Sequence, residues 1–323
     1  MHATYASQGG KRAVAVRSDL PSSKAELMPF IPTLRTALPS RSTEYYSVAP
    51  GLTWSHYLDL FGTTDTGPDS TLPEHDETTA VRRYQAGHTY GIDWNRAPVG
   101  PAVHSPVRKG NHVSLDLVPY AATGTGQHLD SSDSGVTREV VLSSGGRVIH
   151  RTGDLLDIGF TVPGAAERRY TLTVRTTRTA DWTALGTRST MTWGFTSARP
   201  RGSTSSALPL LTVRTGGDVD LNSTASAGRT FRVPLTVQRP AGAERSAVKR
   251  LALQVSYDDG RTWKAVHVTC HGTTGSVLLH HPRRAGYVSL RISAADKAGN
   301  TVTQTVIRAY RLAAAPAAVS NRW

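Results

Sequence analysis

The sequence contains a single cysteine, Cys270, among 323 residues. This excludes an intrachain disulfide and a zinc site built on paired cysteines. We expect Cys270 to be a small, partly buried residue at the end of a strand. The alternative is a catalytic thiol assisted by His271, but adjacent residues of an extended strand point to opposite faces, which disfavours this pairing.

Long apolar runs are also missing. A membrane-spanning helix needs about 18 or more apolar residues in succession, and none of this length occurs, so no membrane span is expected. The N-terminal segment, MHATYASQGG, lacks the apolar core of about 7–15 residues that a signal peptide requires. The chain is therefore either intracellular or the tail of a longer exported protein.

Lysine is scarce, with six residues against thirty-one arginines, and the net charge is +13. A basic balance of this kind is compatible with nucleic acid, an anionic glycan or a membrane surface as a partner. The charges are dispersed, however, because no run of five basic residues occurs and pairs such as Arg82-Arg83 lie between apolar or turn residues. We expect no nucleic-acid partner and attribute the arginine excess to coding bias.

Helix signals are weak, since no segment keeps apolar residues at helical spacing for three turns. The best candidate, Ser22–Pro29, is ended by its proline after about two turns. Alternation with a period of two is common instead, as in Lys11–Ser18 and Thr230–Val237, and Gly, Pro, Asp or Ser separates these short segments. The pattern predicts an all-β chain of antiparallel β-sandwiches.

The length predicts two domains, because a single hydrophobic core seldom grows beyond about 250–300 residues. The polar stretch Arg199–Ser206 marks the expected boundary, and a second polar stretch, Thr63–Glu77, is expected to be a loop. The expected organisation is an irregular β-sandwich in 1–198, with 1–50 as a candidate incomplete upstream element, a linker in 199–207, an immunoglobulin- or fibronectin-like sandwich in 208–312, and a disordered tail in 313–323.

Six segments carry a family resemblance. They are RSTEYYSVAPGLTWSH (Arg41–His56), YQAGHTYGIDWNRAPVGPA (Tyr84–Ala102), MTWGFTSA (Met191–Ala198), RTFRVPLTVQRPAG (Arg229–Gly242), VSYDDGRTWKAV (Val255–Val266) and VSLRISAADKAGNTVTQTVIRAYRL (Val288–Leu312). In this order they resemble the regions that follow the catalytic domain in large secreted subtilisin-like serine proteases of the Streptomyces type. The resemblance implies an exported serine endopeptidase whose protease domain lies on the N-terminal side. Because that domain and an export signal are absent here, we infer a truncated, split or domain-only version.

Fragments of the protease triad motifs are present. The family writes its motifs as Asp-Thr-Gly, His-Gly-Thr-His and Gly-Thr-Ser-Met-Ala, and this chain has Asp65-Thr66-Gly67, His271–Thr274 and Gly186–Met191. Their order is Asp, Ser, His, whereas the family order is Asp, His, Ser. We interpret Asp65 as a turn residue, His271 as a strand end and Ser189 as the start of a strand, and we expect no proteolysis by this chain.

The segment Ser256–Trp263, SYDDGRTW, matches the Asp-box pattern S-x-D-x-G-x-T-W. Asp-Gly favours a tight hairpin, Asp258 is placed to accept hydrogen bonds from turn amides, and Trp263 to pack beneath the turn. Sialidase propellers carry this pattern once per blade, but here it occurs once and without a repeat of about 40–50 residues. We therefore predict a stabilised hairpin rather than a propeller.

Acidic clusters offer two candidate metal sites. One is a calcium site formed by Asp258, Asp259 and Asp296, although turn formation explains all three, since Asp296–Asn300 resembles the last hairpin of bacterial immunoglobulin-like domains. The other is Glu74–Glu77, which we interpret as a solvated loop. His280-His281, which precedes a proline, is interpreted as a turn.

Five aromatic residues cluster within the first part of the chain: Trp54, Tyr57, Tyr84, Tyr90 and Trp94. Aromatic side chains on the face of a sandwich stack against sugar rings in carbohydrate-binding modules, and filling of the core is the alternative. A carbohydrate-binding function predicts an exposed strip of Trp54, Tyr84 and Trp94. The core interpretation makes Trp94 and Trp193 anchors of the first core and Trp263 of the second.

We assign no catalytic, cofactor-binding or metal-ligating residue and expect no cofactor. The expected function is that of a non-catalytic, extracellular accessory region that supports or docks a protease domain, in cis or in trans, or its substrate. The alternative is a free-standing module that binds carbohydrate or cell wall, with an extracellular protein or glycan as its partner. A third hypothesis, an unrecognised hydrolase, requires converging carboxylates or a Ser/His pair.

Overall fold

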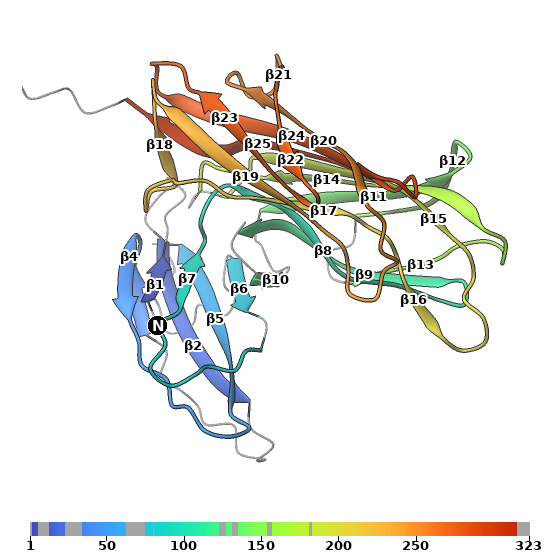
Figure 1. Ribbon diagram of the computed structural model, residues 1–323, viewed down its shortest axis with the longest axis horizontal. Helices are drawn as coiled ribbons and strands as arrows, with labels where there is room; N and C mark the ends of the chain where they lie inside the picture. Colours follow the sequence, from blue (N-terminus) through green and yellow to red (C-terminus); the bar gives the residue numbers. More distant parts are fainter. Residues whose placement is uncertain are drawn as a thin grey trace, which may run out of the picture.

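The computed structural model is built from β-strands alone in its described part, so this part contains no helix of the length and apolarity needed to cross a membrane (Figure 1). The described residues are 2–5, 13–22, 34–62, 75–79, 81–122, 127–130, 135–153, 157–180 and 183–314. The predicted all-β fold is confirmed.

A nine-stranded sheet forms the central layer of the molecule. In spatial order its strands are β12 (Arg147–Thr152), β11 (Val136–Ser144), β14 (Arg168–Arg178), β15 (Arg188–Ser197), β25 (Thr301–Ala313), β24 (Gly286–Asp296), β20 (Val248–Ser256) and β21 (Lys264–Val266), with β18 (Thr224–Ser226) parallel to β25. All other pairings in this sheet are antiparallel.

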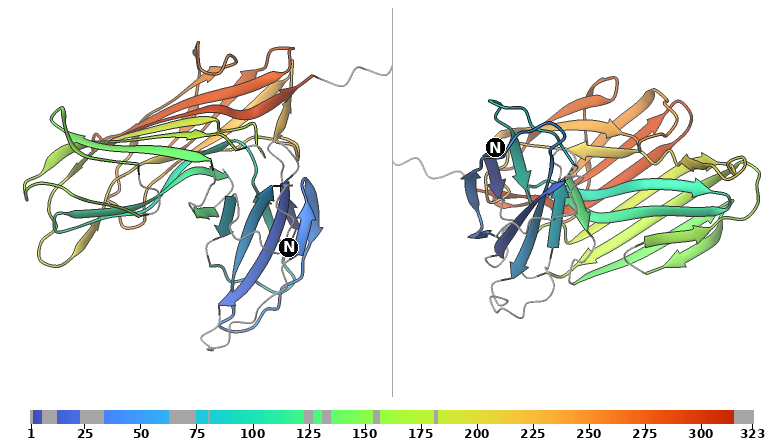
Figure 2. Two further views of the ribbon diagram at one scale, coloured as in Figure 1. Left: turned by 180° about the vertical axis from the view of Figure 1, so that it is seen from behind. Right: turned by 90° about the horizontal axis from the view of Figure 1, so that it is seen from below.

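Two four-stranded antiparallel sheets cover one face of this layer. The first has the order β13 (Asp157–Thr161), β9 (His112–Ala122), β8 (Val99–Lys109) and β16 (Ser205–Ala207). The second has the order β17 (Thr212–Thr215), β19 (Thr230–Gln238), β23 (Thr274–His280) and β22 (Thr269–His271). Figure 2 shows these sheets stacked against the central layer from two further sides.

Both sandwiches have immunoglobulin-like strand order. In the second, β17-β19-β23-β22 corresponds to strands A-B-E-D and β21-β20-β24-β25 to C′-C-F-G, with β18 beside strand G. In the first, β8-β9-β13 corresponds to A-B-E and β12-β11-β14-β15 to C′-C-F-G. The prediction of antiparallel sandwiches, the second immunoglobulin- or fibronectin-like, is confirmed, and the similar order of the first is a new finding.

The two sandwiches are joined strand to strand. β15 pairs with β25 from Arg188↔Ile307 to Gly194↔Thr301, so the last strands of both sandwiches form one continuous sheet. The segment expected to be a linker, 199–207, contains β16, which pairs with β8 of the first sandwich. Whether the chain divides there into independently folding units stays a prediction.

The N-terminal strands form two further sheets, at the lower left of Figure 1. One has the order β10 (Gln127–Asp130), β6 (His75–Thr79), β5 (Thr53–Gly62), β2 (Ala13–Ser22) and β3 (Leu34–Ala37). The other has the order β4 (Ser40–Thr43), β1 (His2–Tyr5) and β7 (Gly91–Trp94), with β1 parallel to β7. The strands within 1–50 thus pair with one another and with β5 and β7 of this chain.

Several sequence predictions fall partly outside the described residues. Of the helix candidate Ser22–Pro29, Ser22 ends β2 and the remainder lies outside. The end of the expected loop Thr63–Glu77 belongs to β6, which begins at His75, and 63–74 lie outside. Of the tail 313–323, Ala313 ends β25, and residues 315–323 lie outside.

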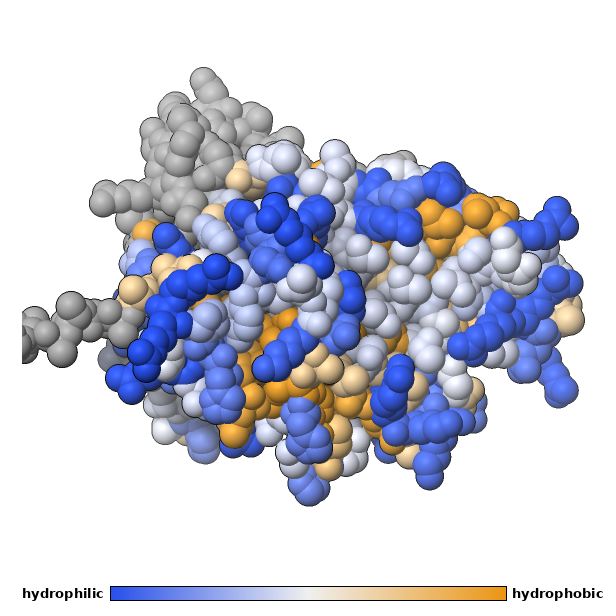
Figure 3. Space-filling model, turned by 90° about the horizontal axis from the view of Figure 1, so that it is seen from above, coloured by the Kyte–Doolittle hydropathy of each residue, from blue (hydrophilic) through white to orange (hydrophobic). Residues whose placement is uncertain are grey.

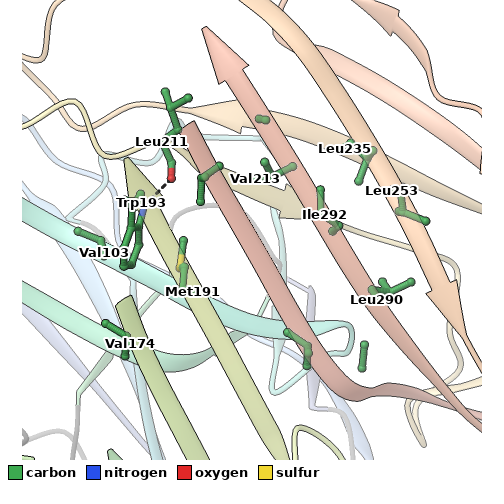
Figure 4. Packing of buried hydrophobic residues seen from close by; sticks show 14 of the residues in the cluster. Val103, Val174, Met191, Trp193, Leu211, Val213, Leu235, Leu253, Leu290 and Ile292 are labelled. Carbon is green, nitrogen blue, oxygen red and sulfur yellow. Dashed lines mark hydrogen bonds between the residues drawn. The ribbon is translucent and has the colours of Figure 1, made fainter. Parts of the chain in front are cut away.

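One hydrophobic core runs through both sandwiches (Figure 4). Alternate residues point inward along β15, where Met191 and Trp193 are both fully buried. The indole Nε1 of Trp193 donates a hydrogen bond to the carbonyl oxygen of Leu211 at 2.8 Å, so it ties the first sandwich to the start of the second. The expected role of Trp193 as a core anchor agrees with its burial.

A buried glutamine connects the two layers of the second sandwich. The Gln304 side chain on β25 accepts a hydrogen bond from the Val213 amide at 2.5 Å and donates one to the Val213 carbonyl at 3.2 Å. Buried backbone groups need hydrogen-bond partners, and at Val213 of β17 the Gln304 side chain makes the two hydrogen bonds that a neighbouring strand would otherwise make.

Candidate functional site

The residues of the triad-like fragments lie apart in the structure. Ser189 is buried in β15, and its Oγ lies 2.7 Å from Oγ1 of Thr176, which donates to the Tyr120 hydroxyl at 3.0 Å. His271 is exposed on β22, in a different sheet. Asp65 lies outside the described residues. The structure therefore does not place Ser189 and His271 in one site.

The Asp-box segment forms the predicted hairpin end. Asp258 Oδ1 accepts hydrogen bonds from Ser256 Oγ at 2.7 Å and the Thr262 amide at 2.9 Å, and Oδ2 accepts one from Thr262 Oγ1 at 2.5 Å. The Thr262 and Ser256 hydrogen bonds lower the pKa of Asp258 to about 2. This carboxylate is thus committed to the turn, as predicted from the sequence.

The three aspartates of the calcium hypothesis do not converge. Asp259 forms a bidentate ion pair with Arg308, at 3.0 and 2.7 Å. Asp296 is buried, accepts hydrogen bonds from the amide and side chain of Asn300, and lies 3.4 Å from Arg239. Each carboxylate therefore has its own partners within the chain. Among the described residues, no group of three or more His, Cys, Asp or Glu side chains is placed to hold a metal ion.

Two sequence predictions about single residues are wrong. Trp263 was expected to anchor the second core, but it is only half-buried, lying against Gly260 with the Arg291 guanidinium 4.2 Å from its ring centre. Cys270 was expected to be partly buried, but it is exposed because β22 is an edge strand with little cover. Both errors arise because alternation does not show which sheet edge lies open to solvent.

His281 was interpreted as part of a turn, but it belongs to a buried polar cluster. Its Nδ1 lies 3.1 Å from the Tyr257 hydroxyl and its Nε2 lies 3.3 Å from the Tyr310 hydroxyl, while the Phe231 ring centre is 5.3 Å away. Burial lowers the pKa of His281 to about 4 and raises the pKa of Tyr257 to about 12. The three polar groups satisfy one another within the second sandwich.

The N-terminal part contains a groove between two loops, which we call the aromatic groove. Its volume is about 650 Å³. One wall is the segment that follows β4, and the other is the segment that precedes β7. The lining residues are Thr43, Glu44, Tyr45, Tyr46, Val48, Tyr84, Gln85, Ala86, Gly87, His88, Thr89 and Tyr90.

The base of the aromatic groove is held by a network of rings. Nε2 of the buried His56 lies 2.6 Å from the Tyr84 hydroxyl. Tyr46 packs edge-on against both His56 and Trp54, with ring centres 4.9 Å apart in each pair. Tyr90 lies 4.7 Å from Tyr84. These contacts fix the aromatic side chains from β5 and both loops in one place.

Polar groups are held at the same place. The Glu44 carboxylate accepts hydrogen bonds from the hydroxyls of Tyr46, at 2.7 Å, and Ser42. The Tyr90 hydroxyl accepts one from the Gln85 amide at 3.1 Å. Beside this ordered set, Tyr45 projects into solvent and is 93% exposed. The groove therefore combines aromatic surface with an acceptor carboxylate, a composition typical of sites for small organic ligands.

Aromatic residues of this region were identified from the sequence, but the arrangement predicted for them was wrong. Trp94 is fully buried, Tyr84 is 6% exposed and Trp54 is half-buried, so these three do not form an exposed strip. Tyr45 and Tyr46 line the groove but were not predicted as site residues, although both lie in the segment Arg41–His56 that carries the family resemblance. Consecutive aromatics next to a carboxylate were the available signal.

Two of the most exposed hydrophobic residues line the aromatic groove. The large hydrophobic residues that are most exposed in the described part are Tyr45, Val48, Val81, Val148 and Leu278. Tyr45 and Val48 both line the aromatic groove. Figure 3 shows another part of the surface, where hydrophilic side chains form separate groups with hydrophobic areas between them.

Comparisons with known proteins do not identify a family for this chain. No protein-family model matches the chain, and no curated protein matches it. Among solved structures, the titin domains Z1Z2 in complex with telethonin are 12% identical, cover 67% of this chain and 96% of their own, and have a TM-score of 0.18.

Two further solved structures match over more of the chain. The three N-terminal domains of the bacteriophage RB49 Highly Immunogenic Outer Capsid protein are 10% identical, with 97% of each chain covered and a TM-score of 0.22. The chicken CNTN1 FN1–FN3 domains are 11% identical, with 94% of this chain and 99% of that chain covered and a TM-score of 0.20. Because these TM-scores are low, we assign the fold from the strand order of the two sandwiches and not from these matches.

Proposed function

We propose that this chain is a non-catalytic binding region whose aromatic groove holds a carbohydrate. The observation that carries the proposal is the exposed Tyr45 beside a groove whose other rings are fixed by hydrogen bonds and edge-on packing. A preformed site of this kind binds without a large cost of ordering its own side chains.

The chemistry of the lining suits a sugar. The negative face of an aromatic ring attracts the weakly positive C–H groups of a pyranose ring, and a carboxylate accepts hydrogen bonds from sugar hydroxyls. On one wall of the groove, Glu44 supplies a carboxylate and Tyr46 an aromatic ring. On the other wall, His88 and Tyr90 supply aromatic rings.

Titration calorimetry with oligosaccharides of glucose and of N-acetylglucosamine tests this proposal. We expect binding to one of them, and Tyr45→Ala to weaken it by roughly two- to tenfold, whereas Tyr45→Phe retains it because the ring remains. Leu278→Ala, at an exposed residue of β23, is the matched control. Absence of binding, or equal loss in the control, contradicts the proposal.

The family resemblance supports a second proposal, that the chain acts beside a secreted subtilisin-like protease and is extracellular. The supporting observation is the order of the six similar segments over nearly the whole sequence. Sequencing of the DNA directly upstream tests it, because an in-frame protease domain with a signal peptide is expected. An unrelated gene in that position, together with failure to bind any subtilisin-like protease encoded in the same genome, would overturn it.

A further inference from the structure

The nine-stranded sheet has a face that neither four-stranded sheet covers, which we call the outer face. Paired residues on neighbouring strands project to the same side of a sheet, so the register defines the rows of side chains on it. The rows are Glu139-Arg175-Thr190-Thr305-Arg291-Gln254, Val141-Thr173-Thr192-Thr303-Ser293-Ala252 and Ser143-Thr171-Gly194-Thr301-Ala295-Arg250.

Small hydroxyl side chains occupy the middle of the outer face. Strands are spaced by about 4.8 Å and same-face residues along a strand by about 6.7 Å, so the threonine hydroxyls form a regular grid. Oγ1 of Thr173 and Oγ1 of Thr192 are 3.4 Å apart across β14 and β15. The grid crosses from one sandwich to the other because β15 pairs with β25. An extended ligand lying across the strands could therefore contact threonine side chains of both sandwiches.

Arginine side chains surround this grid. Arg175 and Arg250 are exposed, and Arg291 donates to Thr305 Oγ1 at 3.3 Å. Arg169 extends over Gly194, where an added Cβ would lie 2.9 Å from its Nη2 and 2.7 Å from Thr301 Oγ1. These guanidinium groups come from β14, β20 and β24, which explains why the sequence shows no basic run.

The charge of the outer face is positive. Within the three rows, all of whose residues are described, Glu139 is the single carboxylate. It is contacted by Arg175, at 2.8 Å, and by Arg151 of β12, which pairs with Val141 at the edge of the face. The face therefore already holds one carboxylate between two guanidinium groups, and Arg291 and Arg169 lie beside the hydroxyls of Thr305 and Thr301.

We propose that the outer face binds a linear polyuronate, a polysaccharide whose sugar rings carry carboxylates. Guanidinium groups pair with carboxylates through two hydrogen bonds, and the threonine hydroxyls exchange hydrogen bonds with those of the sugar. A duplex nucleic acid is a poorer fit, because the face of a sheet inserts no element into a groove of the duplex.

Titration calorimetry of the full chain with oligogalacturonate, at an ionic strength near ~0.15 M, tests this proposal. The face variant combines Arg169→Gln with Arg250→Gln. The control variant combines Arg229→Gln, directly before β19, with Arg232→Gln in β19 of the second four-stranded sheet. Both arginines are exposed, and the control has the same net charge as the face variant. Circular dichroism establishes that both variants fold.

We expect the face variant to bind oligogalacturonate roughly tenfold more weakly and the control less than about twofold more weakly. Tyr45→Ala is expected to leave this binding unchanged, which separates it from the aromatic groove. Equal weakening in both variants would show attraction by net charge alone and overturn the proposal. No binding at all, or tighter binding of a DNA duplex at the same salt concentration, would overturn it as well.

Discussion

Acid is expected to destabilise the second sandwich through His281. His281 is 5% exposed, and each nitrogen of its ring has a tyrosine hydroxyl as its partner. Burial lowers its pKa to about 4 in the folded protein, from 6.5 in an unfolded chain. Since the unfolded state binds the proton more tightly, the contribution of neutral His281 is complete above pH 6.5 and is lost as the pH falls toward about 4.

The size of this effect follows from the two pKa values. Their separation corresponds to roughly 3 kcal/mol of unfolding free energy, at about 1.4 kcal/mol per pH unit. Carboxylates such as Asp258, whose pKa is lowered to about 2, add a loss at still lower pH. That loss is shared by any variant that leaves them unchanged.

Urea unfolding of the wild type and of His281→Gln, near pH 7 and near pH 4, isolates the histidine. Glutamine retains a donor and an acceptor for the two tyrosines but does not titrate in this range. We expect the wild type to lose roughly 3 kcal/mol more than the variant between these conditions. Equal losses in the two proteins would refute the assignment of a buried, neutral His281.

Three further substitutions test the packing, each by urea unfolding against the wild type. Trp193→Ala is expected to cost about 3–5 kcal/mol because it empties a fully buried site and removes a hydrogen bond; a cost below about 1 kcal/mol would contradict the core assignment. Gln304→Leu leaves the buried amide and carbonyl of Val213 without these partners and is expected to cost roughly 3 kcal/mol, with Thr303→Val on the outer face as a near-neutral control. Gly260→Ala is expected to destabilise, because Gly260 has φ of +83° and an added Cβ would lie 2.6 Å from Ile307 Cδ1, and unchanged stability would show that the turn can relax.

The local features of the fold could be predicted from the sequence. Alternation with a period of two selects strands, and Asp258 with Gly260 in the SYDDGRTW segment selects a tight hairpin, because both depend on neighbours along the chain. The immunoglobulin-like second sandwich was predicted for the same reason, from closely spaced strands and turn residues. Trp193 was correctly expected in the core.

Contacts between distant strands were not predictable in the same way. The pairing of β15 with β25 depends on two strand edges that meet only after both sandwiches form, and no local pattern shows it. His281 was interpreted as part of a turn because a proline follows it. The sequence did not show its tyrosine partners, Tyr257 and Tyr310, because both are distant along the chain.

Composition and periodicity were enough to show that this chain is all-β, lacks intrachain disulfides and is rich in arginine, because both are properties of the residues one by one. Which of those residues meet depends on the tertiary structure. It buried Trp94, left Tyr45 beside the aromatic groove, and brought Arg169 and Arg250 to one face. The physical reason is that exposure and proximity are set by strand order and register, which hydrophobic burial fixes only when the sheets pack together.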